Sequence, residues 1–326
     1  MKAITCRTYG MLQLEEVDEP VPGADDVLVD VHAASVNAAD WHLVRGAPYI
    51  ARLRFGLRRP SFGIPGSDLA GTVRAVGRNV TTFQVGDAVF GTSFLQGFGA
   101  FAERAVVPER LLVRKPGTVP FDQAAAIPLA ASTALQGLRD HGRVEAGHQV
   151  LVVGASGGVG TFAVQLAAAF GAEVTAVCSA RNLELVRDLG AAHAVDYTTT
   201  DFTAGGSRFD MILQAAGTHS PGACRRALVP GGTLVQISGD SSNRWIGPIG
   251  RMVAAAALSP LVSQRMTSFT VQPNQRDLAL LADLVERGQV APVLDQTFAL
   301  GEVADAIRHV EGGHTRGKTI VTTTRS

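Results

Sequence analysis

A glycine-rich turn between two apolar stretches is the feature that most restricts how this chain can fold. Residues 150–174 read VLVVGASGGVGTFAVQLAAAFGAEV. Four β-prone residues, a glycine cluster and apolar residues at helical spacing predict a strand, a tight turn and a helix. A second strand is predicted at 172–178, so the whole segment has the size of a strand-helix-strand unit.

The spacing of the glycines predicts a dinucleotide site. Gly154, Gly157 and Gly160 form GxxGxxG, a variant of the Rossmann pattern, in which glycines permit a sharp turn, the approach of backbone to a pyrophosphate and close helix packing. A helix that begins near Val159 would direct free N–H groups and its positive dipole end at phosphate. The residues predicted to bind the cofactor at this turn are Gly154, Ser156, Gly157, Gly158 and Val159.

The end of the second strand predicts which dinucleotide binds. An NAD-preferring site usually carries an acid there for the ribose hydroxyls. Residues 174–182 read VTAVCSARN, and the next acid is Glu184. Ser179 and Arg181 supply a hydroxyl and a guanidinium suited to a 2′-phosphate. NADPH is therefore the predicted cofactor; the alternative is that Arg181 is an ordinary solvated residue at a helix start.

The length of the chain and its changing pattern predict two domains. A chain of 326 residues exceeds what one hydrophobic core usually organises. Short β segments fill the first part, whereas strands and helices alternate from about residue 120, which predicts an α/β fold with a doubly wound parallel sheet. The tail GKTIVTT (317–323) resembles the first part. We therefore expect a β-rich domain at 1–120, completed by 275–326, and a dinucleotide-binding domain at 121–274.

Composition excludes several kinds of partner. Lysine plus arginine and aspartate plus glutamate number 29 each, so no overall field attracts nucleic acid or an anionic membrane. The three cysteines are too far apart to indicate a disulfide framework or a paired-cysteine metal site, and no secretory signal is evident, so we expect a cytoplasmic protein. The uncharged stretch 146–172 is interrupted by the glycine turn, which indicates strand plus helix rather than a membrane span.

Nearly the whole chain resembles the zinc-free, quinone oxidoreductase-like branch of the medium-chain dehydrogenase/reductase superfamily. The stretches that carry the resemblance are VNAADW (36–41), PGSDLAGTVRAVG (65–77), VGDAVFG (85–91), AAAIPLAASTALQGL (124–138), GASGGVG (154–160) and LVPGGTLVQISG (228–239). The resemblance implies a GroES-like β domain on the substrate side and a Rossmann domain that binds NAD(P)H. Homodimerisation is also implied by it and by the closed symmetry common among oligomers.

No catalytic metal is predicted. Zinc enzymes of the superfamily hold their metal through cysteine, histidine and acidic residues in motifs that this chain shares. The matching positions here are Asn37, Ser67 and Asp68, and no cysteine stands near them. Tetrahedral zinc prefers thiolate or imidazole ligands, and the spacing of His32 and His42 matches no known ligand pair.

Without a Lewis acid, oxidation of a simple alcohol loses its usual stabilisation of the alkoxide. Hydride delivery to a quinone or an α,β-unsaturated carbonyl compound is favoured instead. Asn37 is expected to donate its amide to a substrate oxygen or to nicotinamide, unless it only bonds its own backbone; Asp40 is expected to brace that loop. The resemblance implies a tyrosine slightly beyond the Asn/Asp pair, so Tyr49 is expected to supply a proton or hydrogen bond, unless it is a plain half-buried aromatic.

Further cofactor contacts are expected at the ends of strands. The resemblance implies that Thr133 lies beside the nicotinamide and Tyr197 beside the adenosine phosphate, while Lys318 is interpreted as structural. Ligands of parallel sheets lie at the carboxyl ends of strands. The residues predicted on this ground are Ala216, Gly217, Ser238 and Gly239.

Two stretches leave alternatives open. ARLRFGLRRP (51–60), with arginines from Arg52 to Arg59, fits either an anionic substrate such as a CoA thioester or an ordinary solvated basic loop. The apolar stretch 245–264 fits a roof over a substrate pocket, a subunit contact or a core helix.

The sequence thus predicts an NADPH-dependent, zinc-independent oxidoreductase that reduces quinones or α,β-unsaturated carbonyl compounds. Two alternatives are a metal-free alcohol or carbonyl dehydrogenase and an NADPH-binding protein without catalytic activity, because a fold does not fix a function.

Overall fold

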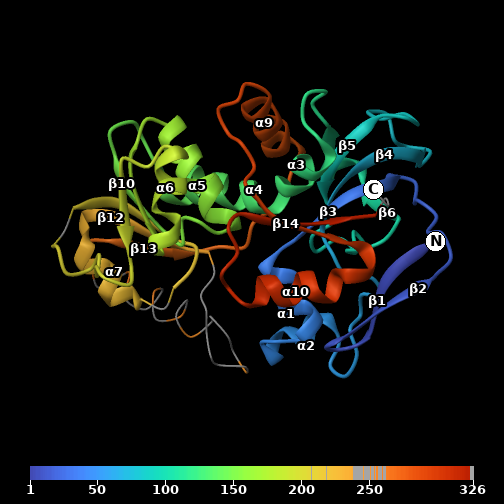
Figure 1. The fold of residues 1–326 in the computed structure, drawn as a ribbon, viewed down its shortest axis with the longest axis horizontal. Helices are drawn as coiled ribbons and strands as arrows, with labels where there is room; N and C mark the ends of the chain where they lie inside the picture. The colour runs from blue at the N-terminus through green and yellow to red at the C-terminus, as the bar shows by residue number, and fades with distance from the viewer. Residues whose placement is uncertain are drawn as a thin grey trace. The chain divides into compact units, whose positions relative to one another are not determined.

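The computed structural model of the chain contains two compact units (Figure 1). The first unit comprises residues 1–132 and 272–326, and the second comprises residues 133–271. The structure describes residues 1–206, 208–217, 219–237, 245, 250, 253, 255, 259 and 262–323. The chain therefore leaves the first unit once and returns to it.

The first unit is built on a seven-stranded, mostly antiparallel sheet and a separate hairpin. Strand β15 pairs antiparallel with β3, so the last strand of the chain lies beside an early one (Figure 1). The hairpin strands are β1 (Lys2–Thr8) and β2 (Met11–Glu16); the sheet strands are β3 (Asp26–Val36), β4 (Asp68–Val76), β5 (Ala88–Thr92), β6 (Arg104–Pro108), β7 (Leu112–Arg114), β14 (Leu294–Ala299) and β15 (Lys318–Thr322).

Short helices surround this sheet. They are α1 (Ala38–Arg45), α2 (Arg52–Phe55), α3 (Phe121–Ala126), α4 (Pro128–Gln136), which begins in this unit, α9 (Gln275–Glu286) and α10 (Val303–Glu311). Because α3 packs against β3, β4 and β15, the boundary of the unit lies after residue 132 rather than after residue 120. Within the described ranges, no helix combines the length and apolar character that a membrane crossing requires.

The core of the first unit follows from the alternation of residues along its strands. In β3, Val27, Val29 and Val31 are buried and alternate with residues that point to the other face. They meet buried aromatic residues that include Phe101. This apolar interior fixes the ends of β3 and β4, where several polar residues are buried.

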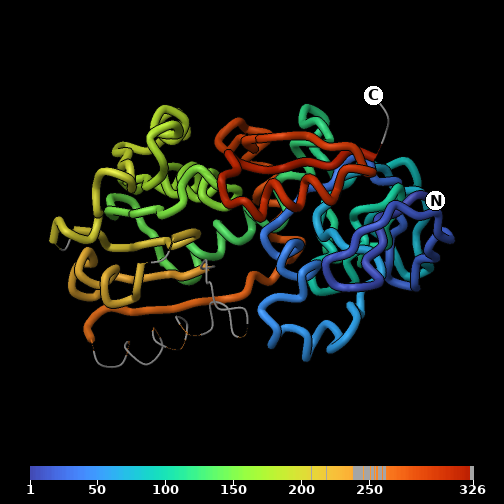
Figure 2. The backbone as a smooth tube through the Cα atoms, turned by 60° about the horizontal axis from the view of Figure 1, so that its bottom comes forward, coloured from blue at the N-terminus to red at the C-terminus, as the bar shows by residue number. Residues whose placement is uncertain are grey.

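A six-stranded parallel sheet forms the second unit, with the order β10-β9-β8-β11-β12-β13. Figure 2 traces the backbone of this unit in colours from green to orange. The strands are β8 (Gln149–Val153), β9 (Glu173–Cys178), β10 (His193–Asp196), β11 (Phe209–Gln214), β12 (Leu228–Gln236) and β13 (Arg265–Ser268). Helices α5 (Gly158–Ala169), α6 (Leu183–Asp188) and α7 (Pro221–Ala227) connect them. The predicted doubly wound α/β fold is confirmed by this sheet.

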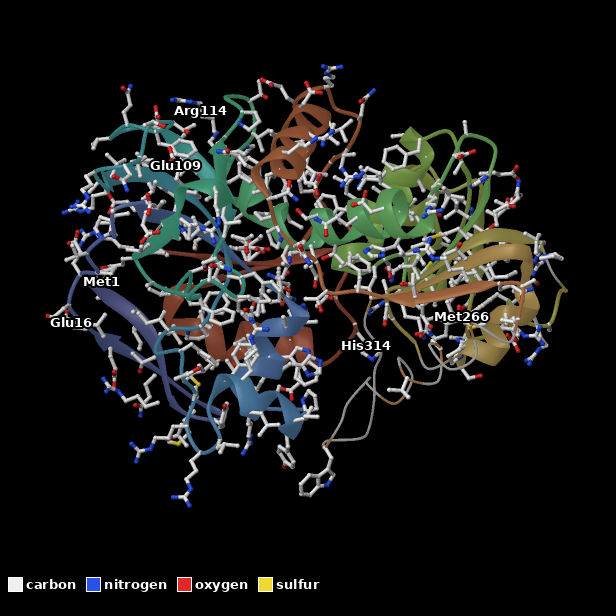
Figure 3. All side chains as sticks on the ribbon, turned by 180° about the vertical axis from the view of Figure 1, so that it is seen from behind. Met1, Glu16, Glu109, Arg114, Met266 and His314 are labelled. Carbon is white, nitrogen blue, oxygen red and sulfur yellow. The ribbon has the colours of Figure 1, made fainter. Side chains whose placement is uncertain are left out.

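The strand order of the second unit places a ligand site. Successive strands run outward from β8 in one direction to β10 and, from β11, in the other direction to β13. In open sheets, the crevice at such a reversal is where ligands bind. The glycine turn follows β8, at this reversal, while Met266 of β13 (Figure 3) is buried in the core of the unit.

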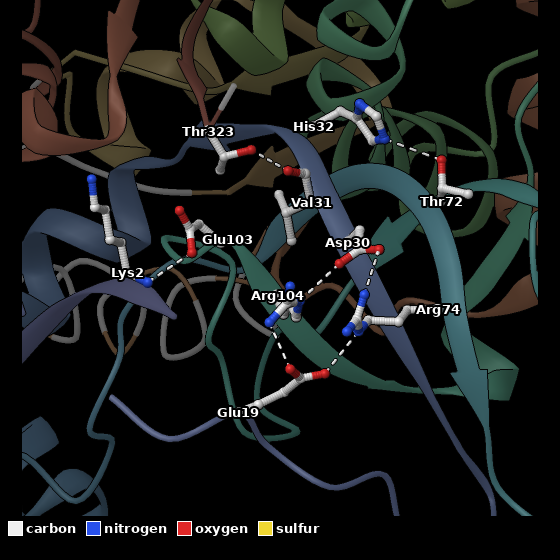
Figure 4. Close-up of polar contacts among 10 residues, drawn as sticks. All are labelled: Lys2, Glu19, Asp30, Val31, His32, Thr72, Arg74, Glu103, Arg104 and Thr323. Carbon is white, nitrogen blue, oxygen red and sulfur yellow. Dashed lines mark hydrogen bonds and ion pairs between the residues drawn. The ribbon is translucent and has the colours of Figure 1, made fainter. Parts of the chain in front are cut away.

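An ion-pair network joins β3, β4 and β6 at the surface of the first unit (Figure 4). Glu19 contacts Arg74 at 2.8 Å and Arg104 at 2.6 Å. Asp30 contacts Arg104 at 2.9 Å and Arg74 at 3.7 Å. Exposed pairs contribute only about 0.2–1 kcal/mol each, so the network adds modestly to the stability that the core supplies.

Candidate cofactor and catalytic sites

The glycine turn of the second unit has the geometry that its sequence predicts. Gly154 adopts φ +81°, and a Cβ there would lie 2.6 Å from the Cβ of Ala216. A Cβ on Gly160 would lie 2.1 Å from the carbonyl oxygen of Gly154, so glycine lets α5 approach the turn closely. Gly157 is open, since its Cβ would meet only that oxygen, at 3.5 Å. A ligand can therefore approach the backbone of Gly157 closely.

Helix α5 begins immediately after this turn. Gly157 is its N-cap, and Gly158 and Val159 occupy its first turn. The first N–H groups of a helix lack partners within it and carry the positive end of the dipole. The turn and the helix start together fit a pyrophosphate, which is the same chemistry that the glycine spacing predicts.

Two serines and an asparagine meet beside the turn. Asn182 Nδ2 donates to Ser156 Oγ at 2.9 Å and to Ser179 Oγ at 3.2 Å. Asn182 is only 3% exposed, whereas both serines are half-buried. Arg181, in the same short 3-10 helix, is exposed. The structure thus brings Ser156 and Ser179 together through a residue that the sequence analysis missed.

The end of β10, the strand beyond β9, carries an aromatic residue and an acid. Tyr197 follows β10, is 53% exposed, and donates its backbone N–H to the carbonyl of Cys178. Asp196 pairs with Cys178 across the two strands. Hydrogen bonds from Thr198 hold the pKa of the half-buried Asp196 carboxyl below its usual range. An acid therefore lies near the end of the second strand, although none occurs there in sequence.

The loop after β11 contains Ala216 and Gly217, which adopts φ +87°. Gln214, at the end of β11, donates its amide to the carbonyl of Gly217 at 3.5 Å and to that of His219 at 3.2 Å. Gln236, at the end of β12, donates in turn to Gln214 Oε1 at 2.9 Å. This amide pair holds the loop at the carboxyl edge of the sheet.

The remaining predictions concern Thr133, Ser238, Gly239 and the apolar stretch 245–264. Thr133 is buried in α4. Ser238 and Gly239 lie outside the described residues, as does most of the stretch 245–264; of its described residues, Trp245 is 72% exposed and Ala255 is buried.

A buried polar cluster lies at the ends of β3, β4 and β15 in the first unit. Lys318 Nζ donates to Asn37 Oδ1 at 2.6 Å and to the carbonyl of Val36 at 3.1 Å. Asn37 Nδ2 donates to Asp68 Oδ2 at 3.0 Å, and the backbone N–H of Asn37 donates to Asp40 Oδ2 at 2.7 Å. Ser67 Oγ donates to Asp40 Oδ1 at 3.3 Å. All three positions that match metal ligands of zinc relatives therefore meet in one cluster.

Burial determines the protonation of this cluster. Burial raises the pKa of Asp40 to about 7, against hydrogen bonding from the backbone of Asn37. It also raises the pKa of Asp68, and the ammonium of Lys318 opposes this rise. The pKa of Lys318 is lowered by burial, and the two carboxylates oppose this change. Burial therefore favours the neutral forms of Asp40, Asp68 and Lys318 more than water would.

The amide of Asn37 keeps one possible donor. An amide nitrogen has two N–H bonds; one is donated to Asp68, and for the other no acceptor is found in the part of the chain that the structure describes. Asn37 is 8% exposed. The Asn37 oxygen already accepts from Lys318, and one N–H of the amide remains available to a ligand.

Tyr49 lies outside this cluster, in an arginine–aromatic stack. The guanidinium of Arg52 lies 4.6 Å from the ring centroid of Tyr49 and 4.4 Å from that of Tyr9. Arg52 Nε also donates to the carbonyl of Gly46 at 2.8 Å. In the basic stretch 51–60, Arg54 of α2 and the later Arg58 and Arg59 are exposed.

The sequence did not identify Asn182 and Asp196 as functional candidates, and Lys318 was interpreted from it as structural. Lys318 carries a signal in the GK pair of its C-terminal strand, but only the pairing of β15 with β3 brings it to Asn37. Among the described residues, no group of three or more His, Cys, Asp or Glu side chains is arranged to hold a metal ion.

Comparisons with known proteins agree with this architecture. The family model described as alcohol dehydrogenase GroES-like domain matches residues 23–117, and the one described as zinc-binding dehydrogenase matches residues 189–321. The chloroplast envelope quinone oxidoreductase homolog of Arabidopsis thaliana is 32% identical over 98% of each chain. The 2-methylene-furan-3-one reductase of Solanum lycopersicum is 33% identical over 98% of this chain and 79% of its own.

Solved structures give the same result. The quinone oxidoreductase from Coxiella burnetii superposes with a TM-score of 0.88 at 28% identity, over 99% of each chain. A protein of the alcohol dehydrogenase superfamily from Novosphingobium aromaticivorans superposes with a TM-score of 0.81 at 32% identity, over 99% of each chain. Together with the glycine turn and the two units, these similarities establish that the chain belongs to the medium-chain dehydrogenase/reductase family of oxidoreductases, among its quinone oxidoreductase-like members.

Proposed function

We propose that this protein is an NADPH-dependent, zinc-independent reductase of quinones or α,β-unsaturated carbonyl compounds. The observation that carries the proposal is the buried cluster of Asn37, Asp68 and Lys318. Asn37 and Asp68 stand at positions that match metal ligands in zinc relatives, and hydrogen bonds join Lys318 to Asn37 and Asn37 to Asp68. Relatives named quinone oxidoreductase and NADPH-dependent alkenal/one oxidoreductase support the substrate class.

The second unit would hold the cofactor. Gly154, Gly157 and the start of α5 fit the pyrophosphate, because the turn is open at Gly157 and helix N–H groups face it. Ser179 and Arg181 would bind the 2′-phosphate. Bound NADPH supplies a hydride from its nicotinamide ring.

The first unit would supply the groups that receive the substrate. In a quinone or an enone, conjugation spreads the negative charge that develops on oxygen, so a hydrogen-bond donor can replace a metal cation there. The remaining N–H of Asn37 is proposed to donate to that oxygen. Tyr49 is proposed to provide the proton, with water as the alternative source.

The chemistry of the donor set supports the proposal of zinc independence. Asn37 and Ser67 stand where thiolate and imidazole would be needed, and Lys318 places a cation where a dication would have to bind. A metal ion at this position would have to displace the ammonium and break its two hydrogen bonds.

A screen of NADPH consumption tests the proposal. Purified protein would be assayed with quinones, enones, enoyl-thioesters and, with NADP⁺, simple alcohols, each before and after dialysis against a chelator. We expect turnover with quinones or enones, unchanged by the chelator. Alcohol oxidation without enone reduction would indicate a metal-free dehydrogenase instead, and binding of NADPH without any turnover would indicate a non-catalytic protein.

Location in the cytoplasm and assembly as a homodimer are part of the proposal. The location is supported by Cys6, Cys178 and Cys224, which are buried and are not joined in disulfides. Cell fractionation tests the location, and sedimentation equilibrium at micromolar concentration tests the assembly.

A further inference from the structure

A buried asparagine links the glycine turn to the end of the second strand of the Rossmann sheet. Asn182 Nδ2 lies 2.9 Å from Ser156 Oγ and 3.2 Å from Ser179 Oγ. Ser156 belongs to the turn after β8, and Ser179 follows β9. Because β8 and β9 are adjacent parallel strands, one amide group holds both hydroxyls at the same edge of the sheet.

The direction of these hydrogen bonds determines what the serines can offer. A hydroxyl has one hydrogen and two lone pairs. Asn182 donates an N–H into each oxygen, so the hydrogen of each hydroxyl must point away from the asparagine. Both serines are half-buried, whereas Asn182 is 3% exposed. Each hydroxyl therefore keeps its O–H for a partner other than Asn182, such as a ligand that reaches these half-buried serines.

The other end of the asparagine amide indicates a role beyond packing. Its Oδ1 is buried, and no residue within the described ranges donates to it. A buried acceptor without a donor lowers stability, and an apolar side chain of similar size would avoid that loss. Local arrangements that reduce stability in this way concentrate at functional sites.

We propose that Asn182 is a positioning residue for the 2′-phosphate of NADPH. It fixes the Ser156 and Ser179 hydroxyls so that both donate to this phosphate, which has three acceptor oxygens. Arg181, the preceding residue, would add the positive charge. This inference rests on the proposed function, because it requires that a dinucleotide binds at the glycine turn.

Calorimetric titration with NADPH and with NADH tests the inference. The proteins are wild type, Asn182→Ala, the double variant Ser156→Ala/Ser179→Ala and the triple variant. We expect Asn182→Ala to weaken NADPH binding about tenfold and NADH binding by less than about twofold, because only NADPH carries the phosphate that receives these hydrogen bonds. Since Asn182 acts through the serines, the triple variant should bind NADPH no more weakly than the double variant.

Asn274→Ala is the matched control. Asn274 caps α9 in the first unit, where its side chain accepts from the backbone N–H of Asp277 at 2.9 Å. Loss of this helix cap should lower the melting temperature and leave the ratio of NADPH to NADH affinity unchanged. Asn182→Ala should change that ratio with little change in melting temperature.

The possible results separate this inference from the proposed function. If wild type binds neither coenzyme, the proposed function fails. If wild type prefers NADH, the site selects through an acid such as Asp196, and the assignment of Asn182 is overturned. It is also overturned if Asn182→Ala weakens both coenzymes equally, or if its effect persists in full when both serines are already alanine.

Discussion

At the scale of single residues, the most unusual feature is a lysine enclosed with two aspartates. Lys318, Asp40 and Asp68 are each at most 3% exposed. Removing charges from water is costly, and mutual attraction offsets that cost only when hydrogen bonds complete the geometry. Here Asn37 accepts from Lys318 and donates to Asp68, so it connects the cation to the carboxylate. The cluster is stable as a unit and vulnerable to the loss of any member.

Lys318→Met should therefore destabilise the protein strongly. Removal of one partner leaves buried carboxylates without a cation, and such losses are typically about 3–5 kcal/mol. Urea unfolding measures the change. The double variant Lys318→Met/Asp68→Asn should recover part of the loss, since it also removes a negative charge. A loss below about 1 kcal/mol in the single variant would show that the cluster is solvated.

Asp40 should make stability depend on pH. Its pKa is raised to about 7 from the ordinary value of 3.8, so the folded state retains a proton that the unfolded state releases. The free energy of unfolding should then fall as pH rises between these values. The amide introduced by Asp40→Asn can accept from the backbone N–H of Asn37 and donate to Ser67 Oγ, which reverses the second hydrogen bond. Asp40→Asn should make this fall shallower by about 1.4 kcal/mol per unit between about pH 5 and about pH 6. Parallel stability curves for wild type and variant would contradict the assignment.

At the scale of elements, the sequence predicts structure that consecutive residues form. It does not predict contacts that depend on the pairing of distant strands. The turn from β8 to α5 was predictable because the order strand, glycines, helix is written in consecutive residues. The Asn37–Lys318 contact was not, because β15 meets β3 only through a long return of the chain. Asp196 was missed for the same reason: parallel pairing of β10 with β9, not sequence, places it beside Cys178. The boundary at residue 132 depends on how α3 packs.

Gly157→Asp should abolish cofactor binding and leave the fold intact. A Cβ there meets only one oxygen at 3.5 Å, so the fold tolerates it, while the carboxylate would repel a pyrophosphate. NADPH at a hundred times its Kd should stabilise wild type by about 2.7 kcal/mol and the variant not at all. Thermal melts with and without NADPH measure this. If NADPH still protects the variant, the site is misassigned.

Gly160→Ala serves as the contrasting variant for this turn. Its Cβ would lie 2.1 Å from the carbonyl oxygen of Gly154, so it should lower the melting temperature even without NADPH.

At the scale of the whole molecule, charge is balanced and the chain is arranged as one unit inserted into another. The numbers of basic and acidic residues are equal, and the isoelectric point is near 7.1. Residues 133–271 form the inserted unit. The balance of charge argues for small-molecule partners recognised locally.

Duplex DNA and anionic vesicles should not bind this protein at physiological salt. The exposed arginines at 54, 58 and 59 are a local exception that is too small to release many counterions. Fluorescence anisotropy with labelled DNA and co-sedimentation with vesicles measure binding. A Kd below about 1 µM for either would contradict this expectation.

The position of β15 also bears on how the protein is made. Translation proceeds from the N-terminus, so the ribosome completes the inserted unit before it adds the strand that carries Lys318. Until then, Asp40 and Asp68 lack their cation, and the sheet around β3 lacks a neighbour. Since domains fold as units during synthesis, the Rossmann unit can mature first, and the other unit matures only after β15 has been made.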